Sequence, residues 1–485
     1  MTGPRILPLD ERYQDYLGDE SCLEGQAESL SFPETEAEVQ AIIAQVRAGG
    51  GRITVQGGRT GLNGSAVPRG GHVLNLSRMN RILDSRLTGD GRRLLTVEPG
   101  LTLADLEQAT RRMGTDPEWF WPPDPTESLA TVGGVVSCPS RGLTAHRYGP
   151  TRSHVQAARV VDAQGRIRTL ERGRERIPSP LPECQGDLLD LYLGAEGMLG
   201  VLTELTLVLV PRPPERWGIG LFFTREADAL ALAEALVQLD QAPGPKVLAA
   251  ADYLDGTTLR LIEAMKPGAT RLRELPELPP GTRAMIYLEL HGPDEAAVVQ
   301  AAATVLERAM ACHVDPDTTW AVSDPASLAR LRAFRHAATE AAHDVLEQAH
   351  RRDPRITRLA LDLGRPGQSF GETLQHYGDQ LRRAELPACL HGSVLDPRLQ
   401  VQILADTFEL HQRGQRLFQD WARAAAAQGL PVRGHGVGKL KQPLLALAAP
   451  RAVLEEARRL KRLLDPEGFW NPGNLFTGDG EEPRP

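Results

Sequence analysis

Cysteine is scarce in this sequence, and its few copies are far apart. The chain of 485 residues has five, Cys22, Cys138, Cys184, Cys312 and Cys389, with no C-x-x-C pair among them. An odd number of distant thiols predicts neither a disulfide framework nor a cysteine-ligated iron–sulfur cluster. We therefore expect a protein of a reducing compartment, the cytoplasm.

Long apolar runs and an excess of positive charge are also missing. No stretch approaches the roughly 18 consecutive apolar residues that indicate a transmembrane helix, and the first residues lack the basic and apolar regions of a signal peptide. Lys and Arg number 55 against 63 Asp and Glu, a formal charge of -8 with the signs interspersed. This balance argues against a nucleic-acid partner, while the length suits two or three domains.

The first half of the chain alternates helix and strand signals. Thr35 and Glu38 predict a capping box before a helix over 36–48. Strands are expected at 53–55, 72–76 and 94–98, followed by a helix that Thr102 opens, a β-hairpin from 157, and a helix, tight loop and long strand over 188–211. An α+β fold follows from this alternation.

Prolines at 211, 213 and 214 mark a boundary. Beyond them, strands at 217–223 and 285–292 alternate with helices over 226–239 and 294–311, which predicts a sheet covered by helices. We expect a first domain over 1–212, a second over 213–429, a C-terminal segment over 430–477 and a disordered tail over 478–485.

A dense group of glycines stands in VQGGRTGLNGSAVPRGG, from Val55 to Gly71. Small residues with exposed amides can form a nest for a diphosphate, although the composition alone also suits a plain surface loop. The spacing by threes differs from the Rossmann G-x-G-x-x-G pattern. GHGVGKL is one residue short of a phosphate-binding P-loop and has Leu440 where magnesium requires Ser or Thr.

Five blocks in order carry a family resemblance: TVQGGRTGLNGSAVPRGGHVLNLSRMNRIL, VEPGLTLADLE, WPPDPTESLATVGGVVSCPSRGLTAHRYG, YLGAEGMLGVLTELTL and DPEGFWNPGNLF. They resemble the vanillyl-alcohol-oxidase / p-cresol-methylhydroxylase (PCMH) flavoproteins, particularly the FAD-linked glycolate oxidase D-subunit and D-lactate dehydrogenase branch. The resemblance implies a two-subdomain PCMH-type FAD-binding domain and a cap domain for substrate, with a helix-covered antiparallel sheet. It also implies FAD-dependent oxidation of a small 2-hydroxy acid.

The same resemblance implies which residues hold FAD. Those at the diphosphate are Gly57, Gly58, Arg59, Thr60, Gly61 and Leu62. Those along the rest of the cofactor are Pro123, Asp124, Thr131, Gly133, Gly134, Ser137, Tyr148, Gly149, Glu196, Gly197, Val201, Asn471 and Asn474. The loop has no His before His72, and Cys138 suits a small buried residue, so we expect the FAD to be non-covalent.

Oxidation of a hydroxy acid needs a cation for the carboxylate and a base for the hydroxyl proton. Arg335 and Thr339, one turn apart on an expected helix, resemble the family's carboxylate clamp and its hydroxyl residue. Arg358 precedes Ala360, where the family usually has Lys, and is expected on the same face of a strand. His435 resembles the family's flavin-facing His, whereas Lys439 and Lys441 read as surface charges.

The branch's metal ligands are replaced here. Ser393, Gln400 and Gly434 stand where metal-dependent members carry two His and a Glu, and His391 alone cannot rebuild such a site. The sequence therefore predicts no divalent metal and leaves the substrate open among small carboxylates. Two alternatives remain: a transferase similar to the alkyl-dihydroxyacetone-phosphate synthases, and a non-catalytic FAD-binding subunit. The electron acceptor and any partner subunit or homo-oligomer are also open.

Overall fold

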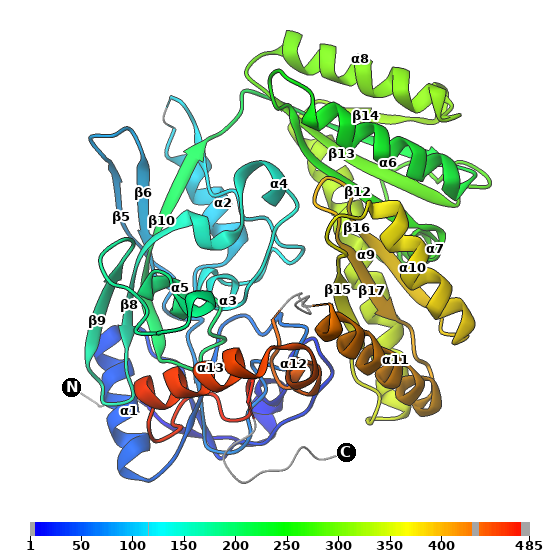
Figure 1. The fold of residues 1–485 in the computed structure, drawn as a ribbon. Helices are drawn as coiled ribbons and strands as arrows, with labels where there is room; N and C mark the ends of the chain where they lie inside the picture. The colour runs from blue at the N-terminus through cyan, green and yellow to red at the C-terminus, as the bar shows by residue number, and fades with distance from the viewer. Residues whose placement is uncertain (1–4, 115, 429–435, 477–485) are drawn as a thin grey trace. The chain divides into compact units, whose positions relative to one another are not determined.

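The computed structural model describes residues 5–114, 116–428 and 436–476 (Figure 1). The chain folds into two compact units. The first unit contains the described residues up to Arg141, Pro150–Pro211 and those from Phe418 onward. The second unit contains Gly142–Gly149 and Arg212–Leu417.

The first unit begins with a small, mostly parallel sheet. Its strands lie in the order β1 (Leu7–Pro8), β2 (Ser29–Ser31), β4 (His72–Asn75), β3 (Ile53–Gln56), and only β1 is antiparallel to its neighbour. Helix α1 (Glu36–Ala48) buries Val39, Ile42, Ile43 and Val46, the spacing of one helical face. These side chains share a hydrophobic cluster with Ile53 and Leu74, which joins α1 to the sheet.

The capping of α1 differs in part from the prediction. Thr35 accepts a hydrogen bond from the Glu38 amide at 3.2 Å, as an N-cap does. The Glu38 carboxylate, however, accepts from the Glu34 amide at 2.8 Å and not from the Thr35 amide. Only half of the predicted capping box is therefore present.

The second sheet of the first unit is antiparallel. Its path is β5 (Ile82–Leu87), β6 (Arg93–Val97), β10 (Val201–Pro211), β8 (Val155–Val161), β9 (Ile167–Glu171), with β7 (Trp119–Phe120) pairing to β10. The helices α2 (Leu103–Arg112), α3 (Val132–Ser137) and α5 (Leu188–Tyr192) contribute to the hydrophobic cluster on one face. The predicted hairpin is β8 and β9, and the predicted helix, tight loop and long strand are α5 to β10.

The C-terminal part returns to the first unit, as the red segments of Figure 1 show. After α12 (Gln442–Ala448) and α13 (Arg451–Leu464), the chain runs along the outer edge of β3. There the Ile53 amide donates to Phe469 and the Asn471 amide donates to Ile53. The short 3-10 helices of this unit are η1 (Glu11–Leu17), η2 (Thr151–His154) and η3 (Pro182–Cys184).

The second unit is built on a seven-stranded antiparallel sheet. The order is β14 (Trp320–Val322), β11 (Glu215–Phe223), β13 (Ala284–Gly292), β12 (Leu248–Asp255), β16 (Ala388–Ser393), β17 (Leu399–Ile403), β15 (Ala360–Leu363). Every pairing within it is antiparallel, which confirms the expected helix-covered antiparallel sheet.

Helices cover both faces of this sheet. α6 (Glu226–Gln241), α8 (Glu295–Ala311) and α10 (Phe370–Arg383) contact one another or the sheet on one side (Figure 1). α7 (Gly256–Met265) and α9 (Pro325–Arg352) pack with β11, β12 and β13 around a shared hydrophobic cluster. The remaining elements are α4 (Ala145–Tyr148), η4 (Pro316–Thr318) and α11 (Phe408–Ala427). In the part of the chain that the structure describes, none of the helices has the length and apolarity needed to cross a membrane.

Candidate flavin and substrate site

The glycine loop, residues 57–66, begins where β3 ends in the first unit. The Gln56 side-chain amide donates to the carbonyls of Tyr16 and Ala66, at 2.8 and 2.7 Å, and so fixes the two ends of the loop. Arg59 adopts a left-handed φ of 59°, with its guanidinium 4.4 Å from the Tyr16 ring and bonded to the Asp15 carbonyl. The loop is therefore held in a defined shape by residues outside it.

The groups of the loop that can bind a ligand are mainly its backbone amides. Within the described ranges, the amides of Gly58 to Leu62 donate to no backbone carbonyl. A Cβ added to Gly57 would lie 2.2 Å from Thr131 Oγ1, and one added to Gly58 would lie 2.8 Å from the Leu129 carbonyl. The loop thus packs against the start of α3, and its amides are available to an anion. This arrangement fits the diphosphate of FAD.

Glu196 joins the glycine loop to the C-terminal return. Its buried carboxylate accepts from the hydroxyl of Ser65 at 2.6 Å and from the amides of Val437 and Gly438 at 2.6 and 2.7 Å. Burial raises the pKa of Glu196, while these hydrogen bonds oppose that rise. Glu196 therefore links the glycine loop to residues 437–438, which pack against it.

Two asparagines of the C-terminal return complete this arrangement. Asn471 accepts from the Val55 amide at 2.7 Å and donates to the Glu196 carbonyl at 2.7 Å. Asn474 donates to the carbonyls of Ser65 and Glu196, at 3.1 and 3.0 Å. Both are almost completely buried, so they organise the loop and the Glu196 turn as one body.

The prediction that Lys439 and Lys441 are surface charges is wrong, because both side chains are buried. They are 5% and 8% exposed. The Lys439 ammonium donates to the Gly64 carbonyl at 3.2 Å and to Asn474 Oδ1 at 2.6 Å, so it is held inside by these two acceptors. Burial lowers the pKa of Lys439 to about 7, and burial raises the pKa of nearby Asp19 to about 6.

The other expected flavin contacts are spread over both units. Pro123, Asp124, Thr131, Gly133, Gly134, Ser137 and Gly197 lie in the first unit, as does Val201, whose side chain is fully buried in the cluster beneath α1. Position 133 requires glycine, because a Cβ there would lie 2.5 Å from Pro99. Tyr148 and Gly149 belong to the segment that packs in the second unit. Thr60, Gly61 and Leu62 are half-buried in the glycine loop.

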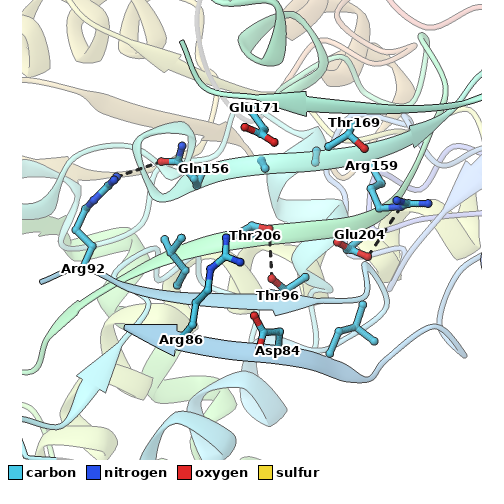
Figure 2. A pocket seen from close by; sticks show the side chains of 14 residues that line it. Asp84, Arg86, Arg92, Thr96, Gln156, Arg159, Thr169, Glu171, Glu204 and Thr206 are labelled. Carbon is cyan, nitrogen blue, oxygen red and sulfur yellow. Dashed lines mark hydrogen bonds and ion pairs between the residues drawn. The ribbon is translucent and has the colours of Figure 1, made fainter. Parts of the chain in front are cut away.

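A hollow of about 500 Å³ lies elsewhere in the first unit, over the second sheet (Figure 2). Its lining includes Asp84, Arg86, Thr96, Glu204 and Thr206, on the sheet face opposite the core residues Leu95 and Leu205. None of the expected flavin contacts is among its lining residues. The hollow is therefore distinct from the glycine loop.

In the second unit, Arg335 is largely buried on α9 and forms an ion pair. Its Nε donates to Asp252 Oδ2 at 2.7 Å, and Nη2 donates to the same oxygen. The two side chains are 11% and 3% exposed. Among the described residues, Nη1 has no hydrogen-bond partner. Thr339 is half-buried one turn further along the helix.

The prediction that Arg358 lies on a strand is wrong. β15 begins at Ala360, so Arg358 lies in the connection before it and not on a strand face. The side chain is 4% exposed, and its Nη2 is 2.7 Å from His343 Nδ1 on α9. It is thus held against the same helix as Arg335.

A buried charged network that the sequence analysis missed lies on β13. Arg332 donates to both oxygens of Glu289 at 2.8 and 2.6 Å, and Tyr287 donates to Glu289 as well. His291 Nε2 is 3.1 Å from Glu289, and its Nδ1 is 2.9 Å from the Tyr148 hydroxyl. Glu289 and His291 alternate with apolar residues in the strand MIYLELHG, a signal of charge on a core face.

The protonation of this network follows from its contacts. Burial alone would raise the pKa of Glu289, but Arg332 and His291 bring it well below its ordinary value. Burial lowers the pKa of His291, which favours the neutral imidazole. Since an ionised carboxylate only accepts, Nε2 carries the proton and Nδ1 accepts from Tyr148. Tyr148 can therefore take a proton while it passes its own to His291.

Two of the positions where metal-dependent members carry ligands, Ser393 and Gln400, lie on neighbouring strands of the second unit. Ser393 of β16 pairs with Asp252 of β12, and Gln400 of β17 pairs with His391. Within the described ranges, no group of three or more His, Cys, Asp or Glu residues could hold a metal ion. Gly434 and His435 lie outside the described residues, but the next residue, Gly436, approaches closely: a Cβ there would be 2.4 Å from Asn63 Nδ2.

Comparison with known proteins identifies two family domains along the chain. Residues 27–171 match the model described as "FAD binding domain", and residues 219–475 match "FAD linked oxidases, C-terminal domain". Glycolate oxidase subunit GlcD of Bacillus subtilis is 28% identical over 442 residues, 89% of this chain and 85% of that one. D-lactate dehydrogenase of Anaerostipes hadrus is 26% identical over 480 residues, 97% of this chain and 94% of its own length.

The fold also has solved counterparts. The crystal structure of p-cresol methylhydroxylase with substrate bound covers 98% of this chain and 95% of its own, with a TM-score of 0.67 and 17% identity. At that identity the likeness establishes the fold alone. It confirms the expected PCMH-type architecture.

Proposed function

We propose, because this chain belongs to the family of FAD-linked oxidases, that it oxidises a small 2-hydroxy acid at its CH–OH carbon. Its cofactor is FAD, and its class is oxidoreductase. When bound, FAD supplies the acceptor for a hydride. The observation that carries the proposal is the glycine loop. Its amides are available to a ligand, and the buried Glu196 holds the loop against residues 437–438, an arrangement that suits a flavin nucleotide.

We propose that the first unit holds this FAD without a covalent bond. The amides from Gly58 to Leu62 would bind the diphosphate, and Asn471 and Asn474 would keep the loop and the Glu196 turn in place. The scarcity of cysteine supports a cytoplasmic protein. Quinone, an electron-transfer flavoprotein, a partner subunit and oxygen are the candidate electron acceptors.

The substrate class rests on Arg335 and on the relatives. Two relatives are named for glycolate and D-lactate, both small 2-hydroxy acids. Arg335 reaches Asp252 through Nε and Nη2, so its Nη1 edge remains for a substrate carboxylate. The partly buried setting would strengthen that contact. We propose that Thr339 and Arg358 assist on the same side of the second unit.

A proton acceptor is needed for the hydroxyl of the substrate. We propose His435 in this role, from its match to the family's flavin-facing His. The described residues offer a second acceptor in the chain Tyr148, His291 and Glu289, because the carboxylate stabilises the imidazolium that forms.

The proposal is tested by anaerobic reduction of the purified yellow protein. Adding D-lactate, glycolate or D-2-hydroxyglutarate should bleach the flavin absorbance, and L-lactate and L-2-hydroxyglutarate serve as matched controls. Colour that no 2-hydroxy acid bleaches would reject the oxidation and favour a transferase or a non-catalytic subunit. A folded protein that takes up no FAD would reject the cofactor site as well.

The same assay distinguishes the two proton acceptors. His435→Ala should leave FAD bound and slow its reduction if His435 takes the proton. Tyr148→Phe should do so if the Tyr148 chain takes it. An unaltered rate in either variant removes that residue from the role.

A further inference from the structure

The strand β5 forms an open edge of the second sheet in the first unit. All six of its residues are exposed, and no described strand pairs with its outer side. Ile82, Leu83 and Leu87 are 38%, 44% and 58% exposed, three of the eight large apolar side chains at the described surface. Edge strands with exposed apolar residues are templates for pairing with another strand.

The direction of the backbone groups on β5 can be read from its partner strand. The Thr88 amide donates to the Arg92 carbonyl at 2.8 Å, and the regular register pairs Arg86 with Leu94 and Asp84 with Thr96. Hydrogen-bonded pairs alternate along an antiparallel ladder. Asp84 and Arg86 therefore turn their backbone groups toward β6, whereas Ser85 and Leu87 present theirs to the open edge.

The side chains of β5 match a second copy of the same strand. A two-fold axis through Ser85 would place Ser85 opposite Ser85, so that their outward backbone groups meet, and would bring Leu87 opposite Leu83 at the bulge. Asp84 would then face Arg86 of the second copy, twice, in the non-hydrogen-bonded positions where side chains are closest. Both side chains line the same face of the sheet (Figure 2).

Neighbouring registers are disfavoured by charge. An axis through Asp84 sets two carboxylates opposite each other, and an axis through Arg86 sets two guanidinium groups opposite each other. Like charges in facing positions destabilise a strand pair, while opposite charges contribute about 0.2–1 kcal/mol each. One register is therefore selected over its neighbours.

We propose that two copies of this chain associate about a two-fold axis by antiparallel pairing of β5, which joins their second sheets into one continuous sheet. The partner is a second copy, and not a foreign strand, because the sequence LDSRL is its own complement in charge and apolar pairing. The bulge between Ile82 and Asp84 limits the regular pairing to the C-terminal part of β5.

The test uses charge reversal in the full-length holoprotein. The wild type should have twice the mass of one chain by sedimentation velocity or light scattering. Asp84→Arg and Arg86→Asp, each alone, set like charges opposite each other and should both give the mass of one chain. Mixing the two variants in equal amounts should restore the dimer mass, since the arginine introduced in one copy then faces the aspartate introduced in the other.

Flavin content should be unchanged in both variants, because the two side chains lie outside the flavin contacts and are exposed in the single chain. A wild type that stays monomeric over the whole concentration range overturns the proposal. So do single variants that remain dimeric, or a mixture of the two that stays monomeric.

Discussion

Asp252 is buried and Arg335 is largely buried, so a change at either one alone leaves the other as an unpaired charge. Breaking such a pair typically destabilises a protein by about 3–5 kcal/mol. A kinetic effect of Arg335→Ala could therefore reflect lost folding and not lost substrate binding. A variant in which both charges are removed together avoids that ambiguity.

We expect Arg335→Gln combined with Asp252→Asn to keep the melting temperature close to that of the wild type. Loss of a charged clamp on the substrate carboxylate should lower kcat/KM about 100-fold, mainly through KM. Steady-state kinetics with a 2-hydroxy acid checks this. Arg330→Gln, which removes a half-buried arginine paired with Glu274 and lying on the same helix as Arg335, is the matched control and should change neither constant. Unchanged kcat/KM in the double variant would remove Arg335 from the clamp.

At the scale of elements, the C-terminal return depends on glycines that come close to the glycine loop. Gly438 has a φ of 53°, and a Cβ there would lie 2.2 Å from the Asn63 carbonyl. Gly468 also has a positive φ, 60°, but has open space around its Cα. Substitutions at Gly438 and Gly468 therefore distinguish the cost of a left-handed backbone from the cost of a steric clash with Asn63.

Gly438→Ala should therefore destabilise the first unit by about 3 kcal/mol or more and weaken FAD retention, because the chain must move away from Asn63. Gly468→Ala meets only the left-handed strain and should cost about 1–2 kcal/mol with FAD retained. Urea unfolding and the flavin-to-protein absorbance ratio measure the two effects. Equal losses in both variants would show that contact with Asn63 has no role.

The sequence was sufficient to predict elements with a strong hydrophobic periodicity and clear turn residues at their ends. The helix over 36–48, the hairpin of β8 and β9, and the step from α5 to β10 follow from local spacing and turn residues. It was insufficient where a residue's surroundings come from distant parts of the chain. The buried Lys439 ammonium donates hydrogen bonds to Gly64 and Asn474, and no local sequence pattern indicates those partners.

The candidate site shows the same division. The blocks that carry the glycine loop and Glu196 could be found from the sequence, whereas the hydrogen bonds between Glu196 and residues 437–438 could not. Arg335 was placed on its helix, yet its pairing with Asp252 depends on how α9 packs on β12. The network of Glu289 and His291 was visible only as two polar residues in an apolar strand.

At the scale of the whole molecule, buried titrating groups make stability depend on pH. Lys439 has its pKa lowered from 10.5 to about 7, so between these values the unfolded chain holds a proton that the folded chain has lost. Stability then rises with pH across that window. Asp19, raised from 3.8 to about 6, has the opposite effect, and stability falls as pH rises from about 4 to 6.

We expect the melting temperature to rise between pH 7 and pH 10 more steeply in the wild type than in Lys439→Met, since the variant lacks the titrating amine. Differential scanning calorimetry at constant ionic strength measures both curves. Asp19→Asn should leave this alkaline slope in place and change only the acidic side, which makes it the control. Parallel alkaline slopes in wild type and Lys439→Met would contradict the lowered pKa.

The carboxylate of Glu196 finds its amide partners at Val437 and Gly438, with the whole of Arg212–Leu417 between them along the chain. A ribosome releases the second unit in full before it releases those partners. Until residues 437 and 438 emerge, the Glu196 carboxylate therefore lacks two of its three hydrogen-bond donors and keeps only the Ser65 hydroxyl.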